Sequence, residues 1–138
     1  MWTRTVTALA ALVSSAVHLF LWFDGYRDIA VVGPAFLLNA VAGAVIAGLL
    51  VLWWHWVPAF LVTGFGASTL FAFVLSATVG LFGVHEQWTG GWVLTAAVSE
   101  VVCVVGGLAL LRRWWLQPSS RSSGVGAQGA VVGRTRAR

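Results

Sequence analysis

Four long runs of apolar residues, separated by short polar segments, dominate the sequence. They cover approximately residues 5–23, 34–56, 59–84 and 91–115. A run of about 18 or more apolar residues is long enough to cross a bilayer as an α-helix, whereas the strands of a membrane barrel are about 9–11 residues long and alternate in polarity. The pattern therefore predicts an all-α fold, a four-transmembrane-helix up-down bundle over residues 1–116.

Composition supports a membrane protein and argues against a soluble domain. Hydrophobic residues make up 59% of the chain and charged residues 9%, and the mean hydropathy is +0.91. After Gln117 and Pro118 the sequence changes to Ser, Gly and Arg with little apolar content. Such a segment cannot bury enough apolar surface to fold, so we expect residues 117–138 to form a disordered basic cytoplasmic tail.

The positions of the positive charges predict the orientation. All eight basic residues are arginines, and only Arg27 lies in the first loop. The others lie at or beyond the free ends of the first and fourth runs: Arg4, Arg112, Arg113, Arg121, Arg134, Arg136 and Arg138. Arginine accumulates on the cytoplasmic side of membrane proteins. We therefore expect a multi-pass protein of the cell membrane with both termini cytoplasmic, and we interpret the basic excess as a topology signal rather than as a nucleic-acid site.

Tryptophan marks the same two boundaries. The nine tryptophans fall near the ends of the apolar runs, where an amphipathic ring reaches the headgroup zone. The predicted inner set is Trp2, Trp53, Trp54, Trp56, Trp114 and Trp115, and the predicted outer set is Trp22, Trp88 and Trp92. His55 falls within the inner set. Two aromatic belts therefore bracket the four predicted spans.

Small residues recur at every fourth position and predict where helices approach closely. The three series are Ala40, Ala44 and Gly48; Gly64, Ser68, Ala72, Ser76 and Gly80; and Ser99, Cys103 and Gly107. Small residues let helix backbones approach one another in lipid, where no hydrophobic effect drives association. We expect these three series to form the helix contacts.

Glu100 is the only charged residue deep inside any of the four runs. A carboxylate near the middle of a span costs about 2.5–3.5 kcal/mol on insertion scales, so such residues usually face a partner or a wet cavity. At about 1.5 Å per residue, His18, Asn39 and Thr78 lie at a similar depth in the outer half of the bilayer, and Ser99 precedes Glu100. We predict that these five residues form a ligand-binding or proton-binding layer.

Two states of the Glu100–His18 pair are open at this point. The pair is either ionised and bridged, or Glu100 is a neutral acid that donates a hydrogen bond to neutral His18. Two roles are open as well. The polar groups either satisfy one another and fix the helix register, or they hold an ion, a proton or a polar ligand.

His85 and Glu86 follow the third run and would form the outer mouth of this layer. Together with His18 and Glu100, His85 is a weak metal-ligand candidate, because histidine and carboxylate side chains suit Zn, Cu or Fe but no close ligand spacing is present. A haem held by His18 and His85 would need both histidines at one depth, and they differ by about 9 Å at 1.5 Å per residue. No cofactor is assigned. The sequence shows no catalytic motif, which leaves open whether the protein is an enzyme.

Three segments carry a resemblance to a group of known proteins. They are SSAVHLFLW at 14–22, GFGAST at 64–69 and SATVGLFGVHE at 76–86. In these segments the chain resembles small, uncharacterised four-helix integral membrane proteins of GC-rich actinobacteria. The resemblance covers residues 1–115. It implies a four-helix membrane fold and brings no activity with it.

Two functions agree with these features. The first is an accessory or binding subunit of a membrane complex, in which the layer around Glu100 and His18 holds a lipid or quinone-like headgroup. The alternative is a small dimeric transporter or proton-coupled carrier that uses the same two residues. The expected partners are the lipid bilayer and either a larger membrane complex or a second copy of the chain.

Overall fold

A computed structural model describes residues 1–80 and 90–116 of the chain. This part is helical and comprises α1 (Trp2–Phe23), a 3-10 turn η1 (Tyr26–Asp28), α2 (Val32–Leu52), α3 (Trp56–Thr78) and α4 (Gly91–Trp115). Within the described residues, all four α-helices are long and apolar enough to cross a membrane. The predicted all-α fold with four membrane-spanning helices is confirmed at this level. The predicted tail at 117–138 lies outside the described residues.

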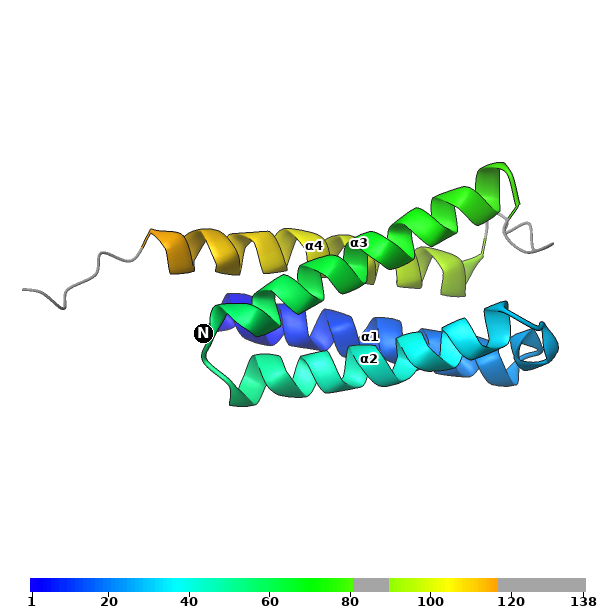
Figure 1. The fold of residues 1–138 in the computed structure, drawn as a ribbon, viewed down its shortest axis with the longest axis horizontal. Coiled ribbons are helices and arrows are strands. Elements are labelled where there is room, and N and C mark those ends of the chain that lie inside the picture. Colours follow the sequence, from blue (N-terminus) through cyan, green and yellow to red (C-terminus); the bar gives the residue numbers. More distant parts are fainter. Residues whose placement is uncertain (81–89, 117–138) are drawn as a thin grey trace, which may run out of the picture.

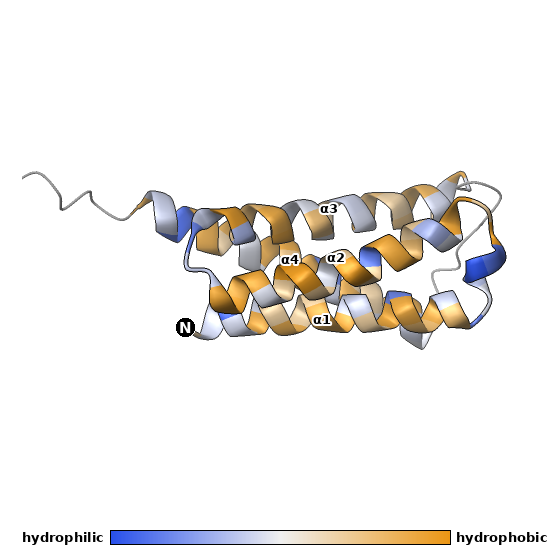
Figure 2. Ribbon diagram, turned by 60° about the horizontal axis from the view of Figure 1, so that its bottom comes forward, coloured by the Kyte–Doolittle hydropathy of each residue, from blue (hydrophilic) through white to orange (hydrophobic). Residues whose placement is uncertain are grey.

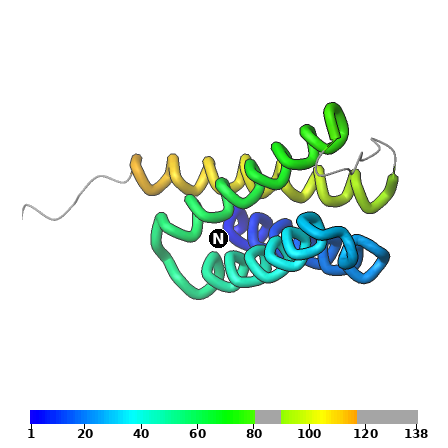
Figure 3. Tube along the Cα trace, turned by 45° about the vertical axis from the view of Figure 1, so that its right-hand side comes forward, coloured from blue at the N-terminus to red at the C-terminus, as the bar shows by residue number. Residues whose placement is uncertain are grey.

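The helices pack as two close pairs, α1 with α2 and α3 with α4, and α1 also packs on α4. The contact between α2 and α3 is much less extensive, and α1 barely touches α3. Figure 1 shows α3 crossing α4 obliquely and diverging from α2 toward one end of the bundle, and Figure 3 shows the same divergence from another side. The two pairs are therefore joined mainly through α1 and α4.

The helix boundaries differ from the predicted runs at several ends. The predicted second run reaches residue 56, but α2 ends at Leu52, and the connection to α3 consists of residues 53–55. His55 caps α3, its Nδ1 accepting a hydrogen bond from the Val57 backbone N–H at 3.3 Å. The predicted third run reaches residue 84, but α3 ends at Thr78 because Gly80 adopts φ +81°. A left-handed glycine just beyond the last turn commonly ends a helix.

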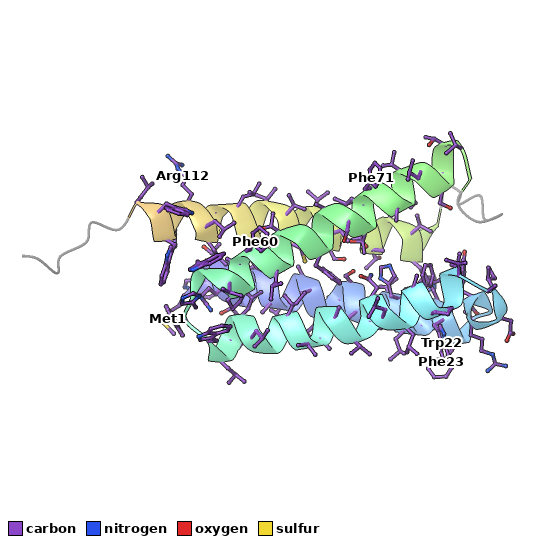
Figure 4. All side chains as sticks on the ribbon, viewed as in Figure 1. Met1, Trp22, Phe23, Phe60, Phe71 and Arg112 are labelled. Carbon is purple, nitrogen blue, oxygen red and sulfur yellow. The ribbon has the colours of Figure 1, made fainter. Side chains whose placement is uncertain are left out.

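The interior consists of small residues, and large apolar side chains face outward. The core includes Ala11, Ala47, Val62 and Cys103, each at most 2% exposed. Phe71 is 65% exposed and lies on the outer side of α3 in Figure 4. Figure 2 shows apolar colour along most of each helix and hydrophilic colour at the turn that contains η1. This arrangement suits lipid, where small residues form the helix contacts and long apolar side chains contact acyl chains.

The predicted small-residue contacts are correct for α4 and wrong for much of α2 and α3. Ser99, Cys103 and Gly107 are all buried. In contrast, Gly64 is exposed, and a Cβ atom there would have no neighbour within 4 Å. The buried glycine of α3 is instead Gly66. The physical reason is that a step of four residues advances about 40° beyond one full helical turn, so a long series of this kind winds off the contact face.

Arg4 and an aromatic group connect the helices at one end of the bundle. The Arg4 guanidinium donates to the Leu50 carbonyl at 2.9 Å and to the Trp53 carbonyl at 2.6 Å. These bonds satisfy carbonyls at the end of α2 that have no partner within the helix. The His55 ring stacks on Trp53 with centroids 5.2 Å apart and lies 5.4 Å from the Trp114 ring. His55 thus belongs to the tryptophan belt, as the sequence predicts.

Candidate functional site

The helices enclose a cavity of about 220 Å³ in the half of the bundle where α2 and α4 begin. Residues from all four helices line it, and its polar side chains are His18, Asn39, Ser68, Thr69, Ser76 and Glu100. The structure therefore brings His18, Asn39 and Glu100 together from three different helices, as their depths in the sequence predict. Their role in binding remains a prediction.

The cavity is partly open, and its exposed lining residues indicate where it opens. Val31, which precedes α2, Ala35 of α2 and Ser68 of α3 are exposed, whereas the lining residues of α1 and α4 are buried or half-buried. The mouth therefore lies between α2 and α3, the neighbouring helices with the least contact. Both helices are long and apolar enough to cross a membrane.

His18 and Glu100 form a buried pair at the inner wall of the cavity. His18 Nε2 lies 3.8 Å from Glu100 Oε1, and the two residues are 9% and 2% exposed. The other ring nitrogen, Nδ1, lies 2.8 Å from the Ser14 carbonyl oxygen. A carbonyl oxygen can only accept a hydrogen bond. Nδ1 therefore carries a proton, and Nε2 is the atom that faces the carboxyl group.

The Ser14 hydroxyl is the hydrogen-bond donor found beside Glu100 among the described residues. It donates to Glu100 Oε1 at 3.5 Å and so links α1 to α4. Thr69 of α3 also lines the cavity, but its hydroxyl donates to the Phe65 carbonyl of its own helix at 2.8 Å. The sequence indicates Ser14 by its position one helical turn before His18, but it does not indicate that Thr69 faces the cavity.

Gly66 fixes the position of Glu100 by allowing α3 to approach α4 closely. A Cβ atom at Gly66 would lie 2.6 Å from the Glu100 carbonyl oxygen and 3.0 Å from Cys103 Cβ. Any larger side chain would therefore separate the two helices at the level of the site. The sequence shows a glycine here, but it does not show that the glycine faces Glu100.

Asn39 carries a polar atom whose hydrogen-bonding capacity is unused. Its Nδ2 is buried and has no hydrogen-bond partner among the described residues. Asn39 lines the cavity together with His18 and Glu100. A buried donor without a partner costs about 1–3 kcal/mol, and native structures contain few of them. The accessible area of this atom is below 1 Å², so a molecule in the cavity would bond to it after the Asn39 amide turns toward the cavity.

The other predicted members of the layer do not line this cavity. The Thr78 hydroxyl donates to the Val74 carbonyl at 2.6 Å, and Thr78 is exposed. The Ser99 hydroxyl donates to the Ala96 carbonyl at 2.7 Å within its own helix. Thr78 is the last residue of α3 and so lies nearer the helix end than predicted, and Ser99 lies on another face of α4. The predicted outer mouth, His85 and Glu86, lies outside the described residues.

The described residues contain no group of three or more His, Cys, Asp or Glu side chains that could hold a metal ion. Of the weak metal candidates, His18 and Glu100 are neighbours, whereas His85 is not described. Cys103 is buried and packs in the core. The geometry of residues 1–80 and 90–116 thus provides two candidate ligands from this set at one place.

Comparisons with protein-family models, with curated protein sequences and with solved structures find no match for this chain.

Proposed function

We propose that the protein binds the polar head of an amphiphilic molecule that enters the cavity from the surrounding membrane. The observation that carries this proposal is the buried, unpartnered Nδ2 of Asn39 in a cavity shared with the His18–Glu100 pair. Polar groups within a membrane span are costly, and they commonly mark sites of function. The mouth between α2 and α3 gives a membrane-dissolved molecule a direct route to these groups.

The size of the cavity supports binding of a head rather than of a whole ligand. Pockets that enclose a complete small molecule usually measure about 300–1,000 Å³, and this cavity measures about 220 Å³. An amphiphile would place its polar head among His18, Asn39 and Glu100 and leave its apolar chain between α2 and α3. Ala35 and Ser68 at the mouth are small enough to let a chain pass.

The orientation is part of the same proposal. An up-down bundle with cytoplasmic termini in the cell membrane would place the cavity in the outer leaflet. Two contacts support the alternating direction of the helices: the Arg4–Trp53 hydrogen bond near one end, and the ring contact of Phe20 with Trp92, 4.5 Å between centroids, near the other. The accumulation of arginine at the free ends supports cytoplasmic termini.

We further propose that the protein acts as an accessory or binding subunit of a larger membrane complex. Nearly all described residues belong to the four helices, so within residues 1–80 and 90–116 the cavity and the helix faces are the main surfaces for recognition. A subunit of this kind would present or store its ligand for a partner. The partner would contact helix faces within the bilayer.

The test is mass spectrometry of the small molecules that leave the protein when it is purified from its native membrane and extracted with organic solvent. We expect one amphiphile to be enriched over the bulk lipid, and Asn39→Leu to reduce that enrichment. Thr78→Val is the control, because Thr78 is an exposed polar residue at the end of α3 that does not line the cavity. Equal enrichment in wild type and Asn39→Leu would refute the proposal.

The buried pair supports a second candidate, a dimeric proton-coupled carrier. An ionisable pair within a span is typical of proton pathways, and His18 and Glu100 lie 3.8 Å apart. We rank this function second because the described helices run without a break, whereas carrier sites are commonly formed by discontinuous helices. Proton-coupled flux in liposomes that Glu100→Gln abolishes would favour the carrier over the binding subunit.

A further inference from the structure

The charge of the cavity restricts the chemistry of its ligand. Among the residues that line it, the ionisable ones are His18 and Glu100. His18 Nδ1 carries a proton, which it donates to the Ser14 carbonyl. What remains to be assigned is the protonation of Nε2 and of the Glu100 carboxyl group. We take the pair to hold one further proton, because a carboxylate left unpaired within a span is costly. The pair is then either an imidazolium with a carboxylate or a neutral imidazole with a carboxylic acid. In both states the pair has zero net charge.

A charged head would therefore lack a counter-charge in this cavity. Among the described residues that line it there is no arginine or lysine, so a phosphate or carboxylate head would be buried without a cation. Glu100 is the only acidic residue in the same set, and when it shares one proton with His18 it offers an ammonium head no net counter-charge. Burying an unpaired ion costs far more than burying a neutral polar group. The cavity thus favours a neutral head.

Asn39 specifies a hydrogen-bond acceptor on that head. The Nδ2 amide donates hydrogen bonds and cannot accept them, and its position in the cavity leaves it without a protein partner among the described residues. A carbonyl oxygen is one neutral group that accepts such a bond without donating one, and it is the acceptor that we assign to the head. The head would therefore point a carbonyl at Asn39.

Aromatic side chains form two walls of the cavity. Phe36 of α2 is held by an edge-on contact with His18, 5.1 Å between centroids, and by stacking on Tyr26 at 4.8 Å. Phe73 of α3 lines the cavity from another helix. Aromatic pairs prefer offset-stacked or edge-to-face geometry at about 4.5–7 Å. A planar ring between these side chains would make such contacts, which a flexible glycerol head cannot.

The volume is that of a single substituted ring. A cavity of about 150 Å³ accommodates one benzene molecule, and this cavity measures about 220 Å³. The difference leaves room for carbonyl oxygens and small substituents on one ring. A chain attached to the ring would leave through the mouth between α2 and α3.

From these four constraints we infer that the ligand is a neutral, single-ring carbonyl compound on an apolar chain, that is, a molecule of the benzoquinone class, with one carbonyl oxygen accepting a hydrogen bond from Asn39 Nδ2. This inference rests on the proposed function and narrows it from amphiphiles in general to one headgroup chemistry. It concerns binding only, and no electron transfer is part of it.

The test uses three probes with similar chains and different heads: a decyl-substituted benzoquinone, dodecanoyl glycerol and dodecyl phosphate. Bound molecules are counted by native mass spectrometry of the full chain in lipid nanodiscs, with empty nanodiscs as the baseline for partitioning. We expect the quinone to bind about one per chain. Asn39→Leu should weaken its binding about 5- to 10-fold, the fold-change of one hydrogen bond worth about 1 kcal/mol, and Thr78→Val should leave it unchanged.

Ala35→Phe provides a second variant that leaves all polar groups intact. Ala35 is exposed and lines the mouth, so a phenyl side chain there should block quinone binding without removing a buried group. Equal binding of the quinone and the phosphate probe would overturn the inference, as would quinone binding that neither Asn39→Leu nor Ala35→Phe changes. Preferential binding of dodecanoyl glycerol would overturn the inference and leave the proposed function intact. Failure of all three probes to bind would contradict both.

Discussion

Two glycines of α3, Gly66 and Gly64, provide a matched test of how tightly α3 and α4 meet at the site. A Cβ atom on Gly66 would lie 2.6 Å from the Glu100 carbonyl oxygen and 3.0 Å from Val104 Cγ2, whereas one on Gly64 would have nothing within 4 Å. Ordinary contacts of this kind measure 3.4–4 Å, so Gly66→Ala must move α3 and α4 apart by about 0.8 Å at Glu100.

The two substitutions should have opposite effects on the free energy of unfolding. Replacing glycine by alanine within a helix contributes up to about 1 kcal/mol of stability through helix propensity, and forcing an extra carbon into a packed interior costs about 1–3 kcal/mol. Gly64→Ala gains the first effect alone. Gly66→Ala combines both, and we expect a net loss of about 1–2 kcal/mol, because its nearest neighbour is a backbone oxygen that cannot rotate away.

The measurement is reversible unfolding of the two variants and wild type in mixed micelles, monitored by circular dichroism. We expect Gly66→Ala to unfold more easily than wild type and Gly64→Ala to unfold no more easily than wild type. Equal stability of the two variants would show that α3 and α4 do not approach closely at Gly66. The described position of Glu100 would then be wrong.

Three further predictions concern the His18–Glu100 pair, the Cys103 thiol and the hydrogen bonds of Arg4. Glu100→Gln should lower the free energy of unfolding by less than about 1 kcal/mol in the same assay. A glutamine amide can still donate to His18 Nε2, and hydrogen bonds between membrane helices average about 0.6 kcal/mol. A loss of about 3 kcal/mol or more would indicate that the pair is ionised in the wild type. Cys103, 0% exposed, should react with a membrane-permeant maleimide only after denaturation, and labelling of the folded protein would contradict its burial. Arg4→Met removes two hydrogen bonds to the end of α2 and should lower the free energy of unfolding by about 1–3 kcal/mol. An unchanged unfolding curve would show that these two bonds do not contribute to stability.

The sequence predicts the number of spans and the members of the central pair because both depend on strong local signals. The four apolar runs are long enough to identify membrane-spanning helices without ambiguity. A single carboxyl group deep in such a run needs polar groups around it. At about 1.5 Å per residue, depth alone places His18 and Asn39 near Glu100. The structure adds the 3.8 Å separation of His18 and Glu100.

The remaining features depend on which face each helix turns inward, and the sequence does not determine this. Thr78 lies at the end of α3 and Ser99 lies on another face of α4, and their hydroxyls bond to their own helices. Thr69 and Glu100 line one cavity, and Gly66, nearly one turn before Thr69, lets α3 approach α4 closely there. In an apolar span nearly every position is hydrophobic, so the amphipathic pattern that would orient a helix in water is weak.

A structure of the full chain in a lipid nanodisc, determined by electron cryomicroscopy with an antibody fragment as a marker, would test the central claim most directly. We predict non-protein density in the cavity, with a polar atom within about 2.7–3.2 Å of Asn39 Nδ2 and a tail that passes between α2 and α3. Closure of α2 onto α3, with Asn39 Nδ2 bonded to a protein group and no density beside His18 and Glu100, would contradict the account.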